Sequence, residues 1–85
     1  MPFGQLVERG MLRPGEMLTS PRGQAAKVRA DGTLIADDIK GSIHQVGAAL
    51  EGAPSCNGWT YWNFRKEGKM VSIDVLRQQI RSEMN

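Results

Sequence analysis

The segment Val28-Arg29-Ala30-Asp31-Gly32-Thr33-Leu34 carries the strongest local signal in this chain of 85 residues. Asp-Gly between two extended runs is typical of a tight β-hairpin, because both positions tolerate the positive φ angles that such a turn requires. We therefore predict one strand over residues 24–29 and its partner over residues 33–36. Glu16 to Thr19 predicts a further short strand, which ends before Pro21.

The pattern changes period at Ser42. Ile43, Val46 and Leu50 recur at helical spacing, Ser42 supplies an N-cap hydroxyl, and Gly52 is placed to end the helix. This stretch predicts an amphipathic helix that begins directly after Ser42.

Residues 59–64 alternate in the manner of a strand. The alternation predicts that Trp62 and Phe64 point into the core while Trp59 and Tyr61 point away from it. Glu67-Gly68 predicts a turn, after which residues 69–71 return as the second strand of a hairpin.

Two helices are predicted at the ends of the chain. Residues 3–8 predict a short helix, with Leu6 and Val7 inward, and Ser72 caps a closing helix with a buried stripe formed by Ile73, Leu76 and Ile80. The fold class is therefore α+β: one small domain over residues 1–85, with short antiparallel strands and hairpins and about three helices.

Composition narrows the class of protein. No apolar run approaches the roughly 18 residues of a membrane span, and the first residues do not resemble a signal peptide, so we expect no membrane association. The single cysteine, Cys56, cannot form an internal disulfide, which favours a reduced, cytoplasmic setting.

Charge is distributed unevenly along the chain. The net charge is +2, made up of +3 over residues 1–30, −3 over residues 31–56 and +2 over residues 57–85. If the two ends meet in the fold, they form a basic face that attracts phosphate. Charges that alternate over a solvated surface explain the same pattern without a partner.

Residues for catalysis are sparse. Cys56 and His44 form a conceivable nucleophile pair, but no third residue is placed to orient the histidine. Asp37-Asp38 indicates a solvated turn rather than paired catalytic carboxylates. Because the chain has neither a P-loop nor a dinucleotide fingerprint, we expect no cofactor and no metal here.

Aromatic and basic residues offer a binding function instead. Trp59 is either a core residue or a ring that stacks on a base or packs against a sugar. Asn57 before it either forms a tight turn with Gly58 or uses its amide for an adenine edge or a phosphate.

Two further features fit an anionic ligand. Ser42 is either a simple N-cap or also a phosphate donor at the helix N-terminus, with Lys40 before it and His44 within one turn. Arg77 and Arg81 lie four residues apart on the predicted exposed side of the last helix. Such like charges repel unless a phosphate, or water and salt, lies across them.

The chain closely resembles the C-terminal domain of the bacterial cell-cycle-regulated DNA adenine methyltransferases, a domain of the RAMA type. The resemblance rests on Gly41-Ser42-Ile43-His44 followed by Cys56-Asn57-Gly58-Trp59-Thr60-Tyr61-Trp62, and it covers nearly the whole chain. Further matching segments are Leu6 to Gly10, Val28 to Leu34 and Ile73 to Arg77.

The resemblance implies a non-catalytic DNA-binding domain of a homodimeric enzyme that transfers methyl from S-adenosylmethionine to adenine N6 at GANTC sites. The catalytic domain, with its Asp-Pro-Pro-Tyr motif, lies outside this chain, so the chain is expected to be a fragment and Met1 its start or an internal residue. The implied partners are double-stranded DNA, in the bacterial nucleoid, and the N-terminal catalytic domain. The implied DNA-binding residues are Ser42, Asn57, Trp59 and Arg77, beside Lys40, His44, Tyr61 and Arg81.

A second class of function remains open at this point. An outward face formed by Trp59 and Tyr61 is also typical of a protein-interaction or dimerisation surface within the same enzyme.

Overall fold

The computed structural model describes residues 2–83, whose six strands form one antiparallel sheet in the order β4-β3-β2-β1-β5-β6. The strands are β1 (Met17–Thr19), β2 (Ala25–Val28), β3 (Leu34–Ala36), β4 (Ile39–Gly41), β5 (Asn63–Lys66) and β6 (Lys69–Ser72). The helices are α1 (Gly4–Glu8), α2 (Ile43–Glu51), α3 (Gly58–Tyr61) and α4 (Asp74–Glu83). The α+β class is confirmed, whereas Met1 lies outside the described residues.

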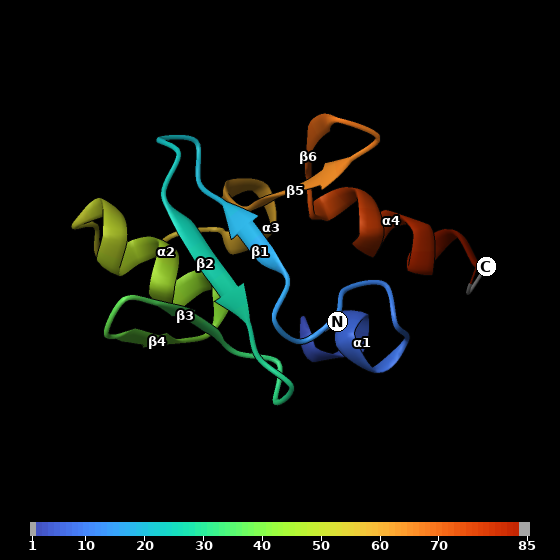
Figure 1. Ribbon diagram of the computed structural model, residues 1–85, viewed down its shortest axis with the longest axis horizontal. Helices are drawn as coiled ribbons and strands as arrows, with labels where there is room; N and C mark the ends of the chain where they lie inside the picture. The colour runs from blue at the N-terminus through green and yellow to red at the C-terminus, as the bar shows by residue number, and fades with distance from the viewer. Residues whose placement is uncertain (1, 84–85) are drawn as a thin grey trace.

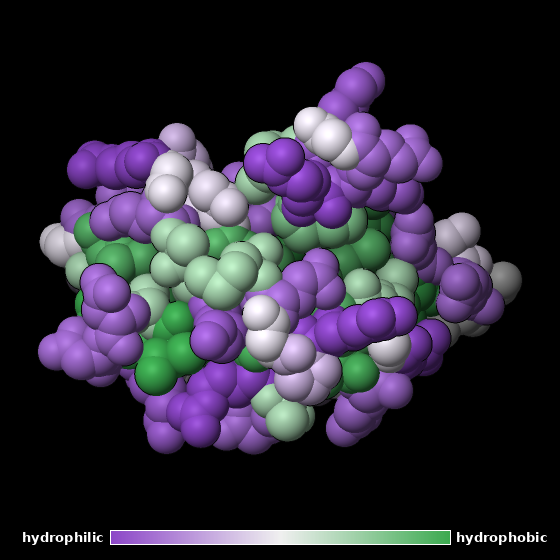
Figure 2. All heavy atoms as spheres, viewed as in Figure 1, coloured by the Kyte–Doolittle hydropathy of each residue, from purple (hydrophilic) through white to green (hydrophobic). Residues whose placement is uncertain are grey.

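The sheet has an inner and an outer face. Inner residues alternate along the strands and are buried with the helices in one core: Leu18, Ala26, Val28, Leu34 and Ala36. In Figure 1 the helices α2 and α3 lie behind β1 and β2, and the β5–β6 hairpin projects beside α4. Figure 2 shows the outer face, where hydrophobic atoms form a band across the middle of the molecule with hydrophilic atoms above and below it.

The predicted helices form where their signals lie. α2 begins after Ser42 and ends at Gly52, which adopts a left-handed conformation (φ 65°). Ile43 and Val46 are fully buried and Leu50 packs against the core. In the last helix Leu76 and Ile80 are buried on one side, with Ile73 just before its first turn.

One strand was not predicted from the sequence. Asp37 and Asp38 form the expected turn, but this turn leads directly into β4, in which Ile39 pairs with Ala36. Asp37 has a positive φ (54°), which an aspartate tolerates better than most residues, and this allows so short a reversal. β4 escapes prediction because three residues carry no measurable alternation.

The prediction of a strand over residues 59–64 is wrong for residues 59–61. Residues 58–61 form the one-turn helix α3, and β5 begins only at Asn63. Asn57 caps α3, because its Oδ1 accepts a hydrogen bond from the Trp59 N–H at 3.1 Å. The expectation that Trp59 and Tyr61 point outward is also wrong: they are 5% and 8% exposed. A helical turn places these aromatic rings on the core, which an alternating strand cannot do.

The two chain ends meet in the fold. Arg9, just after α1, forms an ion pair with Glu83 of α4 at 3.7 Å, and the two helices lie beside each other in Figure 1. The ends therefore do not simply add their positive charges, because one cation of the first third is paired with a carboxylate of the last.

Candidate nucleic-acid interface

An open pocket of about 360 Å³ lies at the N-terminus of α2. Its walls come from four separate parts of the chain: the start of α1, the β2–β3 turn, the first residues of α2, and α3. Among the lining residues are Phe3, Asp31, Ser42, His44 and Trp59. Three predicted site residues, Ser42, His44 and Trp59, thus line one concave surface.

The N-terminus of α2 faces this pocket with a complete cap. The Ser42 hydroxyl oxygen accepts from the Gln45 N–H at 3.1 Å, and the Ser42 N–H donates to Gln45 Oε1 at 2.9 Å. The first turn of α2 contains no acidic residue, so the positive end of the helix dipole is not neutralised from within the helix. The hydroxyl proton of Ser42 donates to no acceptor among the described residues, so both roles considered for Ser42 are compatible.

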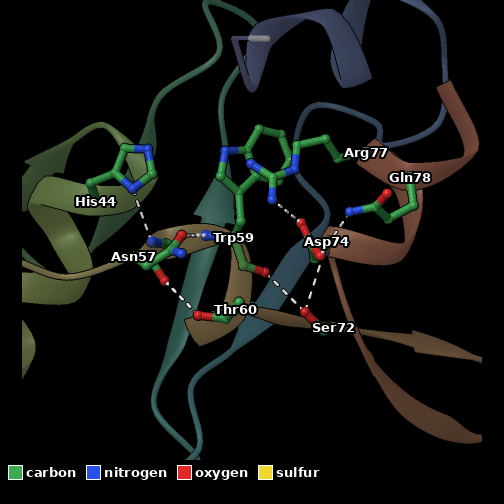
Figure 3. A network of polar contacts seen from close by, with 9 residues as sticks. His44, Asn57, Trp59, Thr60, Ser72, Asp74, Arg77 and Gln78 are labelled. Atoms are coloured by element: carbon green, nitrogen blue, oxygen red, sulfur yellow. Dashed lines mark hydrogen bonds and ion pairs between the residues drawn. The ribbon is translucent and has the colours of Figure 1, made fainter. Parts of the chain in front are cut away.

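His44 joins α2 to α3. Its Nδ1 accepts a hydrogen bond from the Gly58 N–H at 2.9 Å, as Figure 3 shows. A neutral imidazole that accepts at Nδ1 carries its proton on Nε2. Because the side chain is exposed and lines the pocket, Nε2–H is available as a donor to a ligand.

Asn57 is exposed, but the oxygen of its side-chain amide already accepts a hydrogen bond within the protein. Its Oδ1 caps α3 through the Trp59 N–H, while its NH₂ group makes no hydrogen bond with any described residue. Pairing with an adenine edge needs both ends of the amide. The geometry therefore favours Asn57 as a donor, for example to a phosphate oxygen.

Trp59 packs against both Phe3 and Arg77. Its ring centroid is 6.0 Å from that of Phe3, and the Arg77 guanidinium carbon lies 4.8 Å above the indole (Figure 3). A planar guanidinium on an indole face is a favourable cation–π arrangement. One face of the indole is therefore occupied, and only the part of the side chain that lines the pocket can meet a ligand.

Arg77 differs from the prediction, which placed it on the exposed side of α4. Its side chain is 19% exposed and forms an ion pair with Asp74 of the same helix. The carboxylate of Asp74 offsets the repulsion expected between Arg77 and Arg81, so no phosphate is required to do so. Arg81 is exposed, one turn further along α4.

Ser72 ties this group to the backbone of α3. Its hydroxyl donates to the Trp59 carbonyl at 2.9 Å and its oxygen accepts from the Asp74 N–H at 3.2 Å. The polar contacts in Figure 3 thus connect α2, α3 and α4 around Trp59. Asn57 and Arg77 thus contact Trp59 directly, whereas Ser42 shares only the pocket with it.

Tyr61 is not part of the pocket. Its ring packs edge-on against Trp62 at 5.0 Å and faces α2, where a Cβ on Gly47 would lie 3.2 Å from it. Burial raises the pKa of the Tyr61 hydroxyl, so the group stays neutral. The aromatic face of Trp59 and Tyr61, which the sequence offered as a docking surface, does not exist as a surface.

Lys40 lies on the outer face of the sheet, in register with Ile35 of β3. It nevertheless acts on the pocket electrostatically. Two hydrogen bonds from Thr33, the shorter at 2.6 Å, and the charges of Arg29 and Lys40 hold the pKa of Asp31 below its usual range. Asp31 therefore remains a carboxylate in the pocket wall, with two cations nearby.

A catalytic role for Cys56 and His44 finds no support. Burial raises the pKa of the Cys56 thiol and the negative charge of Glu51 adds to the shift, which opposes formation of a nucleophilic thiolate. His44 Nδ1 is engaged by Gly58 rather than by sulfur. Across residues 2–83, no three His, Cys, Asp or Glu side chains gather in a way that could hold a metal ion.

Three residues of this region escaped sequence reasoning. Asp31 was considered only as a turn residue, and nothing local indicates that Phe3 packs on Trp59. Asp74 could have been found, because its spacing of three residues from Arg77 is that of an ion pair within a helix.

Comparison with known families identifies the class of protein, which is that of modules associated with restriction enzymes and adenine methylases. The chain belongs to the Restriction Enzyme Adenine Methylase Associated (RAMA) family, whose model matches residues 1–85. The protein is therefore a methylase-associated α+β module. Over the described residues, no helix is long and apolar enough to cross a bilayer.

Proposed function

We propose that this chain is a non-catalytic DNA-binding module of an adenine-N6 DNA methyltransferase, and that it contacts the duplex at the pocket beside α2. The observation that carries the proposal is that Trp59 and the N-terminus of α2, whose first turn holds no acidic residue, line one open pocket. Helix N-termini bind phosphate through free N–H groups and the positive dipole end. Membership of a methylase-associated family supports DNA as the source of that phosphate.

Each residue has a defined role in the proposal. The Ser42 hydroxyl and His44 Nε2–H donate to phosphate oxygens, and the Asn57 NH₂ group supplies a third donor. The accessible part of Trp59 packs against a deoxyribose or an unstacked base. Arg77 lies above the indole and supports the ring, and its charge is balanced by Asp74. Lys40 and Arg81 add charge at a greater distance.

Methyl transfer belongs in this proposal to a separate catalytic domain of the same homodimeric enzyme, which binds S-adenosylmethionine and acts at GANTC-type sites. That domain must unstack the target adenine, which costs a few kcal/mol. A second domain that binds the backbone offsets this cost. Catalysis and DNA binding are thus divided between two domains of a nucleoid-associated protein.

The test is a fluorescence-anisotropy titration of a short duplex at several salt concentrations. We expect weak binding with little preference between GANTC and a scrambled site, and an affinity that falls steeply with salt. Ser42→Ala should weaken binding several-fold, whereas Ser55→Ala, in an exposed loop, should not change it. Equal affinities for these two variants would contradict the role of the α2 N-terminus.

A second candidate function has its own observation. Met17, Lys27, Ile35 and Lys40 pair in register across β1 to β4 and form one row on the outer sheet face. Met17 is 47% exposed, and the row contains no carboxylate. Such a row suits a protein surface with aliphatic and acidic side chains. If protein docking is the main function, the wild-type chain should bind the catalytic domain but not DNA. Met17→Glu should then abolish the association with the catalytic domain.

A further inference from the structure

The β5–β6 hairpin is the most strongly basic element of the molecule. Arg65, Lys66 and Lys69 are all exposed, and Glu67 is the only acid within residues 65–69. The tip thus carries a net charge of +2, which equals the net charge of the whole chain. None of the three cations has a carboxylate within ion-pair distance among residues 2–83.

The register of the hairpin places like charges against each other. Lys66 pairs directly with Lys69, and Arg65 pairs with Met70. Like charges directly opposite on an antiparallel pair are destabilising. The turn forms because Glu67 and Gly68 both adopt positive φ, at 53° and 81°, so backbone geometry and not charge holds the tip together. An anion between the two lysines would remove the repulsion.

The shape of the hairpin indicates which kind of anion it can bind. β5 and β6 form a two-stranded ribbon that projects from the body beside α4 (Figure 1), and its tip is hydrophilic in Figure 2. Only Thr19 of β1 pairs with β5, so most of the ribbon has no further strand beside it. A two-stranded ribbon fits the major groove of B-DNA, and basic side chains at its tip reach phosphates at the groove edges.

The base of the hairpin is fixed to the residues around Trp59. The Ile73 N–H donates to the Trp62 carbonyl at 3.1 Å where β6 ends, and the Ser72 hydroxyl bonds the Trp59 carbonyl. The hairpin therefore has a defined position relative to Trp59 and Arg77 and does not move freely. A duplex held at the pocket would meet a rigid second contact.

We propose that the β5–β6 hairpin is a second contact to duplex DNA, in which Arg65, Lys66 and Lys69 bind the phosphate backbone. The inference rests on the proposed function, since it takes DNA as the ligand of the module. It adds a site separate from the pocket, on residues that no family motif used above includes.

The experiment compares two variants with the same change of charge. Lys66→Gln/Lys69→Gln removes the facing lysines, and Arg13→Gln/Arg22→Gln removes two exposed cations elsewhere. The slope of log K against log salt is negative, and each phosphate contact adds about 0.9 to its magnitude. We expect the magnitude of the slope to be smaller by about 1.8 in the hairpin variant, because two contacts are lost. The control variant should keep the wild-type slope within error.

Urea unfolding of the same variants shows whether the hairpin variant is folded. Because it relieves repulsion, its unfolding midpoint should equal or exceed that of wild type. If wild type binds duplex and the hairpin variant retains the wild-type slope, the hairpin contact is wrong while the proposed function stands. If wild type binds no duplex, the proposed function fails as well. Loss of binding to vesicles of phosphatidylserine and phosphatidylcholine, with duplex binding unchanged, would also overturn the hairpin contact.

Discussion

The N-termini of α2 and α4 both have a serine cap, but only that of α4 has an acidic residue in its first turn. Each has a serine hydroxyl that accepts from a backbone N–H, at Ser42 and Ser72 respectively. At α4 the Ser72 hydroxyl proton is used by the Trp59 carbonyl, and Asp74 in the first turn pairs with Arg77. At α2 the hydroxyl proton is free among the described residues, and no acid lies in the first turn.

The difference shows that a capped helix end is not in itself an anion site. The dipole of α4 is satisfied by its own carboxylate, and that carboxylate also holds Arg77 over the indole. The first turn of α2 has no such carboxylate, and the acid that lines its pocket, Asp31, belongs to the β2–β3 turn. One helix end thus builds the structure around Trp59, and the other is available for binding.

Loss of the indole should have the largest effect, since Trp59 lines the pocket at α2 and packs against Arg77 of α4. Trp59→Ala removes a buried ring that packs on Phe3 and supports Arg77, and it should lower the free energy of unfolding by about 3–5 kcal/mol. Urea denaturation measures this. Met70→Ala, at an exposed side chain, should change stability by less than about 0.5 kcal/mol. A loss near 1 kcal/mol at Trp59 would mean that the ring is not a structural centre.

A methyl group at Gly58 should disturb the junction of α2 and α3. A Cβ there would lie 2.7 Å from the carbonyl carbon of Ile43, whereas at Gly47 the nearest atom is the Cys56 Sγ. Backbone cannot give way as a side chain can, so Gly58→Ala should cost about 1–3 kcal/mol. Gly47→Ala should cost less. Thermal unfolding of both variants measures which one is less stable. A Gly58→Ala protein that is more stable than Gly47→Ala would contradict the prediction.

The two serines provide the sharpest test of the comparison. Ser42→Ala should lower stability by about 1 kcal/mol, because it removes a bond to a free helical N–H. Ser72→Ala should cost more, because the Trp59 carbonyl loses its donor as well. Only Ser42→Ala should weaken DNA binding at a protein concentration where both variants are folded. Circular dichroism and anisotropy on the same samples separate the two effects. An equal loss of affinity in Ser72→Ala would remove the distinction between the two helix ends.

The smallest effect is expected at Asp31, the acid that lines the pocket at the N-terminus of α2. Asp31→Asn keeps an acceptor for Thr33 but removes a negative charge from the pocket wall, so DNA should bind slightly more tightly. The lowered pKa means that the carboxylate stabilises the fold above pH 3.8, and this contribution is lost as pH falls through the folded-state pKa. The stability difference between the two proteins should therefore vanish in acid, as urea unfolding at several pH values can show.

Much of the fold could be predicted from local signals. The hairpin at Asp31-Gly32, the turn at Glu67-Gly68 and the cap at Ser42 all formed where their residues indicated. Each depends on backbone preferences of two to four neighbouring residues. β4 and α3 could not be predicted in this way, since one is too short to show a period and the other has the alternation of a strand.

The sequence offered candidate binding residues, and only the fold decided how they are placed. Ser42 and Trp59 line one pocket and Asn57 and Arg77 contact Trp59, but Trp59 is buried and Arg77 is paired. Exposure depends on what the rest of the chain places nearby, here Phe3 and Asp74, and no local pattern reports it.

The sequence alone determined the α+β class, the amphipathic helices and the turns, because these follow from periodicity, from the φ angles that Gly and Asp permit, and from the cap hydroxyl of Ser. Tertiary structure alone decided that residues 58–61 coil into a helix, that Tyr61 turns away from the pocket, and that Asp31 joins its wall. These outcomes depend on contacts between segments far apart in the chain. The free energy of burying an aromatic ring exceeds the weak local preference for an extended strand.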